Sequence, residues 1–131
     1  MLIEVSNGEL VDKITILEIK KKKIKDLDKL KHVEAELEKL YPSYYELEQA
    51  TGDRWVTLLH KFKHDLYMIN DSLWEVEDKI RECERTSNFG DDFIKLARSV
   101  YMNNDKRAAL KKEINELTRS EFEEVKSYEQ Y

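Results

Sequence analysis

The chain has 131 residues, of which 39% are charged and 40% hydrophobic, with a net charge of −5, one proline and three glycines. So few turn formers exclude a sheet of many strands and favour one domain, residues 1–131, built from long helices. The lone Cys83 and the absence of a long apolar stretch or secretory leader predict a cytoplasmic protein without a membrane partner, and the acidic balance disfavours nucleic acid.

The first predicted helix begins near Asn7. Ser6 and Glu9 have the spacing of a capping box, in which the Ser6 hydroxyl accepts from the Glu9 amide and the Glu9 side chain reaches back to the Ser6 amide. Apolar residues then recur at three- and four-residue steps as far as Ile24. Extra isoleucines widen this apolar face, so we expect the helix to contact more than one other helix. A break is expected at residues 26–28.

The second helical pattern is expected to end at Pro42, because the proline ring clashes with the preceding turn and donates no hydrogen bond. Ser43 and Glu46 have the spacing of a second capping box, which predicts a separate short helix that ends near Gly52. The apolar residues of the second pattern are Leu30, Val33, Leu37 and Leu40.

The third element carries the strongest apolar pattern in the chain. Its steps alternate between four and three residues, which is typical of a coiled-coil seam rather than an ordinary amphipathic helix. We expect this seam to lie against a companion of equal length, either within the chain or in an oligomer. Its members are Trp55, Leu59, Phe62, Leu66, Ile69, Leu73, Val76, Ile80 and Cys83.

A fourth helix is predicted after the loop at residues 86–90, and the tail from Arg119 is expected to be a short helix or an extended strap. The simplest architecture is all-α: a long, coiled-coil-like antiparallel hairpin of the last two helices, with the N-terminal helices packed along it as a bundle. One side of the fourth helix carries Phe93, Ala97, Val100, Tyr101, Asn104, Ala108, Lys111 and Ile114.

Three segments resemble a small, uncharacterised protein family of bacteria and phages. Residues 5–17 read VSNGELVDKITIL, residues 96–115 contain LARSVY followed by ND, RA and KEIN, and residues 123–128 read EEVKSY. The last segment differs from the family pattern by the valine at its centre. The resemblance implies kinship, and it implies no activity because the family has no known function.

Polar residues interrupt the apolar side of the fourth helix, and two interpretations stay open. A seam asparagine such as Asn104 fixes helix register and oligomer state, which is the interpretation we favour. Alternatively, the polar residues line a pocket in which an arginine binds a carboxylate or phosphate. The candidate ligand-binding residues are Arg98, Asn104, Asp105, Arg107 and Lys111.

Other clusters have simpler explanations. His60 and His64 share a helix face but supply only two ligands between flanking lysines, so no metal site is predicted. Carboxylates of the last two helices project outward, which argues against a magnesium-dependent nucleotide hydrolase, and no cofactor is predicted. The run Lys20–Lys23 is interpreted as a solvated helix end near the negative pole of the helix dipole.

The sequence therefore favours a non-enzymatic interaction or assembly protein. Its apolar helical surface exceeds what one slender bundle buries, which predicts a homo-oligomer, with a dimer favoured, or a further partner protein. The alternative is a small all-α enzyme or binding protein for a phosphorylated or carboxylated metabolite, with its site on the polar stripe of the last helix.

Overall fold

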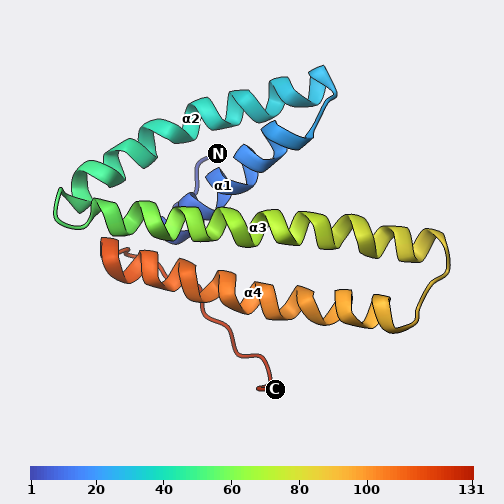
Figure 1. Ribbon diagram of the computed structural model, residues 1–131. Coiled ribbons are helices and arrows are strands. Elements are labelled where there is room, and N and C mark those ends of the chain that lie inside the picture. Colours follow the sequence, from blue (N-terminus) through green and yellow to red (C-terminus); the bar gives the residue numbers. More distant parts are fainter.

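The computed structural model describes all 131 residues and contains four helices and no strand, which confirms the all-α bundle (Figure 1). The helices are α1 (Asn7–Lys23), α2 (Leu27–Thr51), α3 (Val56–Arg85) and α4 (Asp91–Thr118). α3 and α4 run antiparallel side by side, and α1 and α2 pack over one half of this pair. None of the four helices combines the length and apolar character that crossing a membrane requires.

The start of α1 agrees with the sequence in one of its two capping interactions. The Ser6 hydroxyl accepts a hydrogen bond from the Glu9 amide at 3.1 Å, which satisfies one of the free amides of the first turn. The Glu9 carboxylate lies instead 2.7 Å from the ammonium group of Lys111 on α4. The first turn of α1 is therefore held both by its own cap and by another helix.

The predicted break at Pro42 is wrong, because α2 continues through this residue to Thr51. A proline removes one amide donor from the helix, but α2 packs against the core on both sides of it. Leu37 before the proline and Tyr44 after it are both buried. Tertiary packing therefore keeps one helix where local sequence predicted two, and α2 is followed by Gly52, whose φ is 82°.

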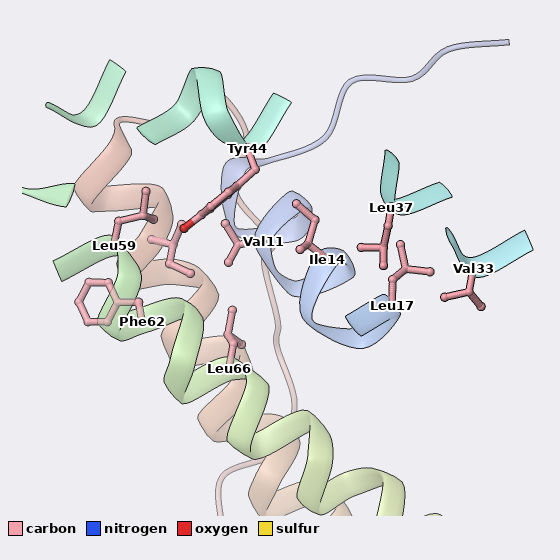
Figure 2. Close-up of a cluster of buried hydrophobic side chains, with 10 residues drawn as sticks. Val11, Ile14, Leu17, Val33, Leu37, Tyr44, Leu59, Phe62 and Leu66 are labelled. Carbon is pink, nitrogen blue, oxygen red and sulfur yellow. The ribbon is translucent and has the colours of Figure 1, made fainter. Parts of the chain in front are cut away.

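The hydrophobic core lies where the four helices meet (Figure 2). Each helix contributes the side chains that its three- and four-residue spacing places on one face, and these close a single cluster. Its members are Val11, Ile14 and Leu17 of α1, Val33, Leu37 and Tyr44 of α2, Leu59, Phe62 and Leu66 of α3, and Ile114 of α4.

The predicted α3 seam is buried at its start and half-covered further along. Leu59, Phe62 and Leu66 lie in the core, whereas Ile69, Leu73, Val76 and Ile80 are half-buried. Trp55, the first predicted member of the seam, lies just before α3. It is the cap residue of this helix and is 44% exposed, with the Arg54 guanidinium over its ring.

The hairpin of α3 and α4 thus has two parts. We call residues 71–104 the arm, and the remainder of the four helices the base. Of the 19 buried residues, only Cys83 lies in the arm. Figure 1 shows the reason: α1 and α2 lie along the other part of α3 and α4, while the far end of the arm extends past them as two helices alone.

The tail after α4 forms an extended strap, which is one of the two predicted alternatives. The Ser120 hydroxyl accepts a hydrogen bond from the Asn7 amide at 3.0 Å. At the other end, the Tyr131 hydroxyl donates to the Asp105 carboxylate, and its ring lies edge-on to that of Tyr101 with centroids 5.3 Å apart. The strap therefore runs along α4 and returns to the border between base and arm.

Candidate functional site

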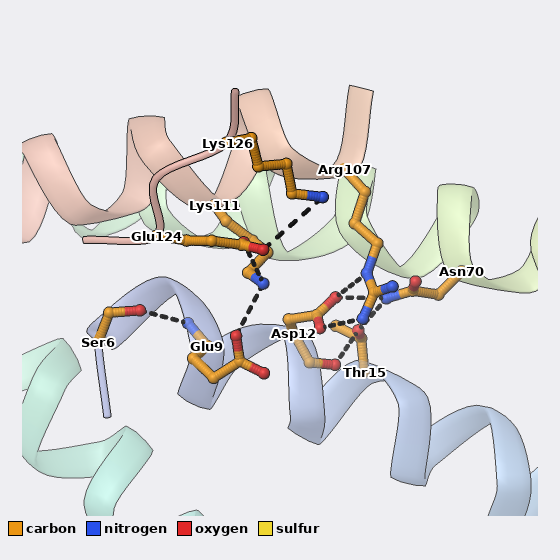
Figure 3. A network of polar contacts seen from close by, with 9 residues as sticks. All are labelled: Ser6, Glu9, Asp12, Thr15, Asn70, Arg107, Lys111, Glu124 and Lys126. Carbon is orange, nitrogen blue, oxygen red and sulfur yellow. Dashed lines mark hydrogen bonds and ion pairs between the residues drawn. The ribbon is translucent and has the colours of Figure 1, made fainter. Parts of the chain in front are cut away.

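A cluster of polar side chains lies between α1, α3, α4 and the strap, next to the hydrophobic core (Figure 3). It consists of two neighbouring groups of polar contacts, one around Asp12 and one around Lys111, and both join residues distant in sequence. We call it the polar cluster, and its members are Glu9, Asp12, Thr15, Asn70, Arg107, Lys111 and Glu124.

Asp12 is the centre of the polar cluster, and its side chain is only 1% exposed. Arg107 on α4 binds it with two parallel hydrogen bonds, from Nε to Oδ1 at 2.8 Å and from Nη2 to Oδ2 at 2.5 Å. This bidentate geometry is the strong form of an arginine–carboxylate pair. The hydrogen bond to Asp12 raises the pKa of Arg107, against the opposing effect of burial.

Asn70 on α3 also donates a hydrogen bond to the Asp12 carboxylate. Its Nδ2 donates to Asp12 Oδ1 at 2.9 Å and to Thr15 Oγ1 at 2.9 Å, and the Thr15 hydroxyl donates to the Asp12 backbone oxygen at 2.7 Å. Each buried polar group thus has a partner, as stable interiors require. One carboxylate of α1 thereby fastens α3 and α4 together, and it has little freedom to act as a catalytic base.

Lys111 forms the second half of the polar cluster. Its side chain is 8% exposed and lies between Glu9 at 2.7 Å and Glu124 of the strap at 2.8 Å. Burial alone would lower the pKa of Lys111, but hydrogen bonds to Glu124 and Glu9 outweigh it and raise the pKa. The bond from Lys111 in turn lowers the pKa of Glu124. The buried ammonium group is thus compensated from α1 and from the tail.

Gly8 permits the close approach of α1 to α4. A Cβ atom there would lie 2.5 Å from the backbone oxygen of Lys111, where only a hydrogen atom fits. The Gly8 amide donates to Asn115 Oδ1 at 2.7 Å. The glycine of the N-terminal motif therefore lies against the Lys–Glu–Ile–Asn segment of α4, so the segments that carried the family resemblance meet in space.

The structure brings together three of the five predicted ligand-binding residues. Asn104, Arg107 and Lys111 line a cavity of about 250 Å³, whereas Asp105 is exposed and bonded to Tyr131. Arg98 is exposed on the arm, away from the polar cluster. Because the cations in the cavity already pair with carboxylates, an anion would have to displace a partner. Ligand binding at this stripe stays a prediction.

Sequence reasoning missed the residues that organise the polar cluster, above all Asp12 and Asn70. A signal was present for Asp12, which lies four and seven residues before Ile16 and Ile19 and so shares the second apolar stripe of α1. A charge within an apolar stripe that contacts a partner helix needs a buried counter-charge. No local signal identified Arg107 as that counter-charge.

A second cleft lies between α1, α2 and α3, with a volume of about 480 Å³. Lys63 pairs with Glu18 at 2.9 Å across it, and His60 contacts Glu48. Burial raises the pKa of the Tyr44 hydroxyl, which has no hydrogen-bond partner. No group of three His, Cys, Asp or Glu side chains in the molecule is arranged to hold a metal ion.

Comparison with known proteins gives a family and no activity. A family described as "Family of unknown function (DUF6165)" matches residues 1–131. No curated protein and no solved structure matches the chain.

Proposed function

The chain belongs over its whole length to this family of unknown function, and on that premise we propose that it is a non-enzymatic helical module that assembles through its arm. The observation that carries the proposal is the poor burial of the arm. Its helices bear apolar side chains at regular spacing, yet Cys83 is the only residue in it that is buried. Two helices alone cannot enclose such a face, which additional helices would cover.

The side of the hairpin that α1 covers in the base continues along the arm beyond the end of α1, which reaches only the first turns of the arm at Asp71 and Glu75. Asn70 faces α1, and Trp74 lies one turn further along the same stripe of α3. On α4, Arg107 faces α1, and Val100 lies two turns away on the same stripe. The arm therefore presents an apolar surface like the one that α1 occupies in the base, where other helices can pack.

The arm also exposes large apolar side chains to water. Ile94 is 50% exposed and Tyr101 is 44% exposed, and Phe89 at the loop is 52% exposed. Ile94 and Tyr101 lie seven residues apart on one stripe of α4, and exposed apolar side chains that share a stripe favour an interaction surface. Association of copies through the arm, with a dimer as the smallest closed form, would remove them from water.

Sedimentation velocity at about 20 µM protein tests the proposal, since micromolar association is within the range of modest helical interfaces. The wild-type chain is expected to sediment as a dimer or larger oligomer. The double variant Trp74→Gln/Ile94→Gln, which leaves the charge of the arm unchanged, is expected to sediment as a monomer with unchanged helix content.

The control changes two exposed apolar side chains of the base. Met68 is 52% exposed and Tyr45 is 62% exposed, and Tyr45→Gln/Met68→Gln is expected to keep the association of the wild type. A wild-type chain that is strictly monomeric at this concentration, or a control that dissociates as readily as the arm variant, contradicts assembly through the arm.

A further inference from the structure

We infer that the arm of each copy docks on the basic corner of a second copy, in a twofold dimer held by reciprocal contacts of opposite charge. The inference rests on the proposed function and adds to it the partner, the receiving surface and the arrangement. We call residues 20–32, where α1 ends and α2 begins, the corner. It carries seven lysines and only two aspartates. The lysines are Lys20, Lys21, Lys22, Lys23, Lys25, Lys29 and Lys31.

We call residues 71–92, which are α3 of the arm, the loop and the first two residues of α4, the outer arm, and this segment has the opposite charge. Residues 71–92 carry eight carboxylates and three basic side chains, in a chain whose net charge is −5. The corner is thus strongly positive and the outer arm strongly negative, although the molecule as a whole is only moderately acidic. Complementary patches of this kind direct association and fix its register.

One contact within the chain shows that these two surfaces fit each other. Lys23 at the end of α1 lies 2.7 Å from Glu75 and 3.1 Å from Asp71, both on the first turns of the arm. Hydrogen bonds to Glu75 and then to Asp71 raise the pKa of Lys23. The corner therefore already pairs with the arm at the point where the two meet within a single copy.

The rest of both patches has no partner within the chain. The other six lysines of the corner form no ion pair. Nor do Asp78, Glu84, Asp91 and Asp92 on the outer arm. A second copy would pair these free charges. It would also cover Leu27, which lies at the tip of the corner and is 75% exposed.

The arrangement of the helices allows both contacts at once. The corner and the free end of the arm lie on the same side of the molecule (Figure 1). The arm helices extend about 20 Å at 1.5 Å per residue. Two copies that lay their arms antiparallel place the tip of each arm beside the other copy's corner, and a twofold axis makes the two contacts equivalent. A polyanion such as a nucleic acid fits this side less well, because the neighbouring arm would repel it.

A charge-reversal experiment tests the inference. The corner variant is Lys21→Glu/Lys22→Glu/Lys25→Glu, and the arm variant is Asp78→Lys/Glu84→Lys. All five positions are exposed and unpaired, so circular dichroism is expected to show unchanged helix content. At about 0.1 M salt each variant alone is expected to dimerise about tenfold or more weakly than the wild type.

An equimolar mixture of the two variants is the decisive sample. In a mixed dimer the reversed corner of one copy meets the reversed arm of the other, and the two unchanged surfaces also meet. The mixture is therefore expected to regain wild-type affinity as a heterodimer, detected by sedimentation velocity at the same protein concentration with one copy carrying a fusion tag, so that the heterodimer sediments apart from either homodimer. Wild-type association is also expected to weaken as salt rises, since salt screens exposed charges.

The control Lys39→Glu/Lys61→Glu/Lys112→Glu changes the net charge by the same amount as the corner variant, at exposed lysines elsewhere. It is expected to dimerise like the wild type. A wild-type monomer would overturn both proposals. A wild-type dimer that ignores the reversals, or a mixture that does not recover, would overturn only the docking of arm on corner. Corner-dependent binding to phosphatidylserine vesicles with an unchanged dimer would assign the corner to a membrane and also overturn it.

Discussion

The base and the arm share the two long helices α3 and α4, yet they use arginine–carboxylate pairs in opposite ways. In the base, Asp12 and Arg107 belong to different helices, and their side chains are 1% and 28% exposed. In the arm, Glu77 and Arg81 belong to the same helix and are 53% and 72% exposed. The pair in the base joins two helices that are distant in sequence and is shielded from water. The pair in the arm lies on the surface of a single helix and is exposed to water.

The difference shows where the stability of the molecule comes from and where its surface remains available. A buried pair matters for stability because removing one partner leaves the other as a desolvated charge without a counter-charge. An exposed pair contributes little, because water and salt already compensate both charges. The base therefore depends on buried contacts within the chain. The arm keeps exposed charges and apolar side chains that another molecule can contact.

The largest expected effect contrasts the two arginines directly. Arg107→Ala leaves the Asp12 carboxylate buried without its cation, which is expected to lower the free energy of unfolding by about 3–5 kcal/mol. Arg81→Ala removes only an exposed pair within α3 and is expected to cost about 0.5 kcal/mol or less. Urea denaturation followed by circular dichroism measures both. Equal losses would show that the polar cluster contributes no more than surface charge.

Two glycines give the next contrast. A methyl group at Gly8 would collide with the α4 backbone at Lys111, so Gly8→Ala is expected to cost about 1–3 kcal/mol by forcing α1 away from α4. At Gly90, before α4, the nearest atom to an added methyl group is Asn88 Oδ1 at 3.6 Å, an ordinary contact.

Gly90→Ala is therefore expected to change the free energy of unfolding by less than about 0.5 kcal/mol, because a weaker helix cap and a less flexible unfolded chain have opposite effects. Both variants are measured in the same urea series. A Gly8→Ala protein as stable as wild type would mean that α1 can shift on α4 at no cost, and that the close approach is incidental.

Local sequence signals predicted the features of the fold that depend on neighbouring residues. The capping serine placed the start of α1 at Asn7, and the apolar ladder identified Leu59 and Leu66 as core residues of a long helix. The ladder was equally regular in the arm, where the side chains are only half-buried. Periodicity shows which side chains share a face, but it does not show whether another helix covers that face.

The errors and omissions have the same origin in contacts between distant parts of the chain. Pro42 does not end α2, because core packing on both sides maintains the helix. Asp12 and Arg107 are 95 residues apart, and Asn70 joins them from a third helix. No spacing rule links such positions. The resemblance to a family did mark the segments that contain two of them, without indicating that they pair.

The smallest expected effect concerns the strap, which joins the border of the arm to the base through the pair of Glu124 and Lys111. The pKa of Glu124 is lowered from its ordinary value of 4.5. Its contribution to stability is therefore complete above pH 4.5 and is lost as pH falls through the lowered value. Because the Glu124 side chain is 40% exposed, solvent screening keeps this contribution below about 1 kcal/mol.

Glu124→Gln imitates the protonated carboxyl group at neutral pH and allows the strap to be tested without acid. Trypsin cleavage after Lys126 in the strap is expected to accelerate severalfold, while circular dichroism shows the helix content of the wild type. Glu123→Gln, which changes a neighbouring carboxylate that forms no ion pair, is expected to alter neither. Lys111 keeps Glu9 as a partner when Glu124 is neutral, so the buried cation is never left alone. If Glu124→Gln instead destabilised the protein as much as Arg107→Ala, the strap would contribute to stability as the base does. The base would then include the tail as well as the helices.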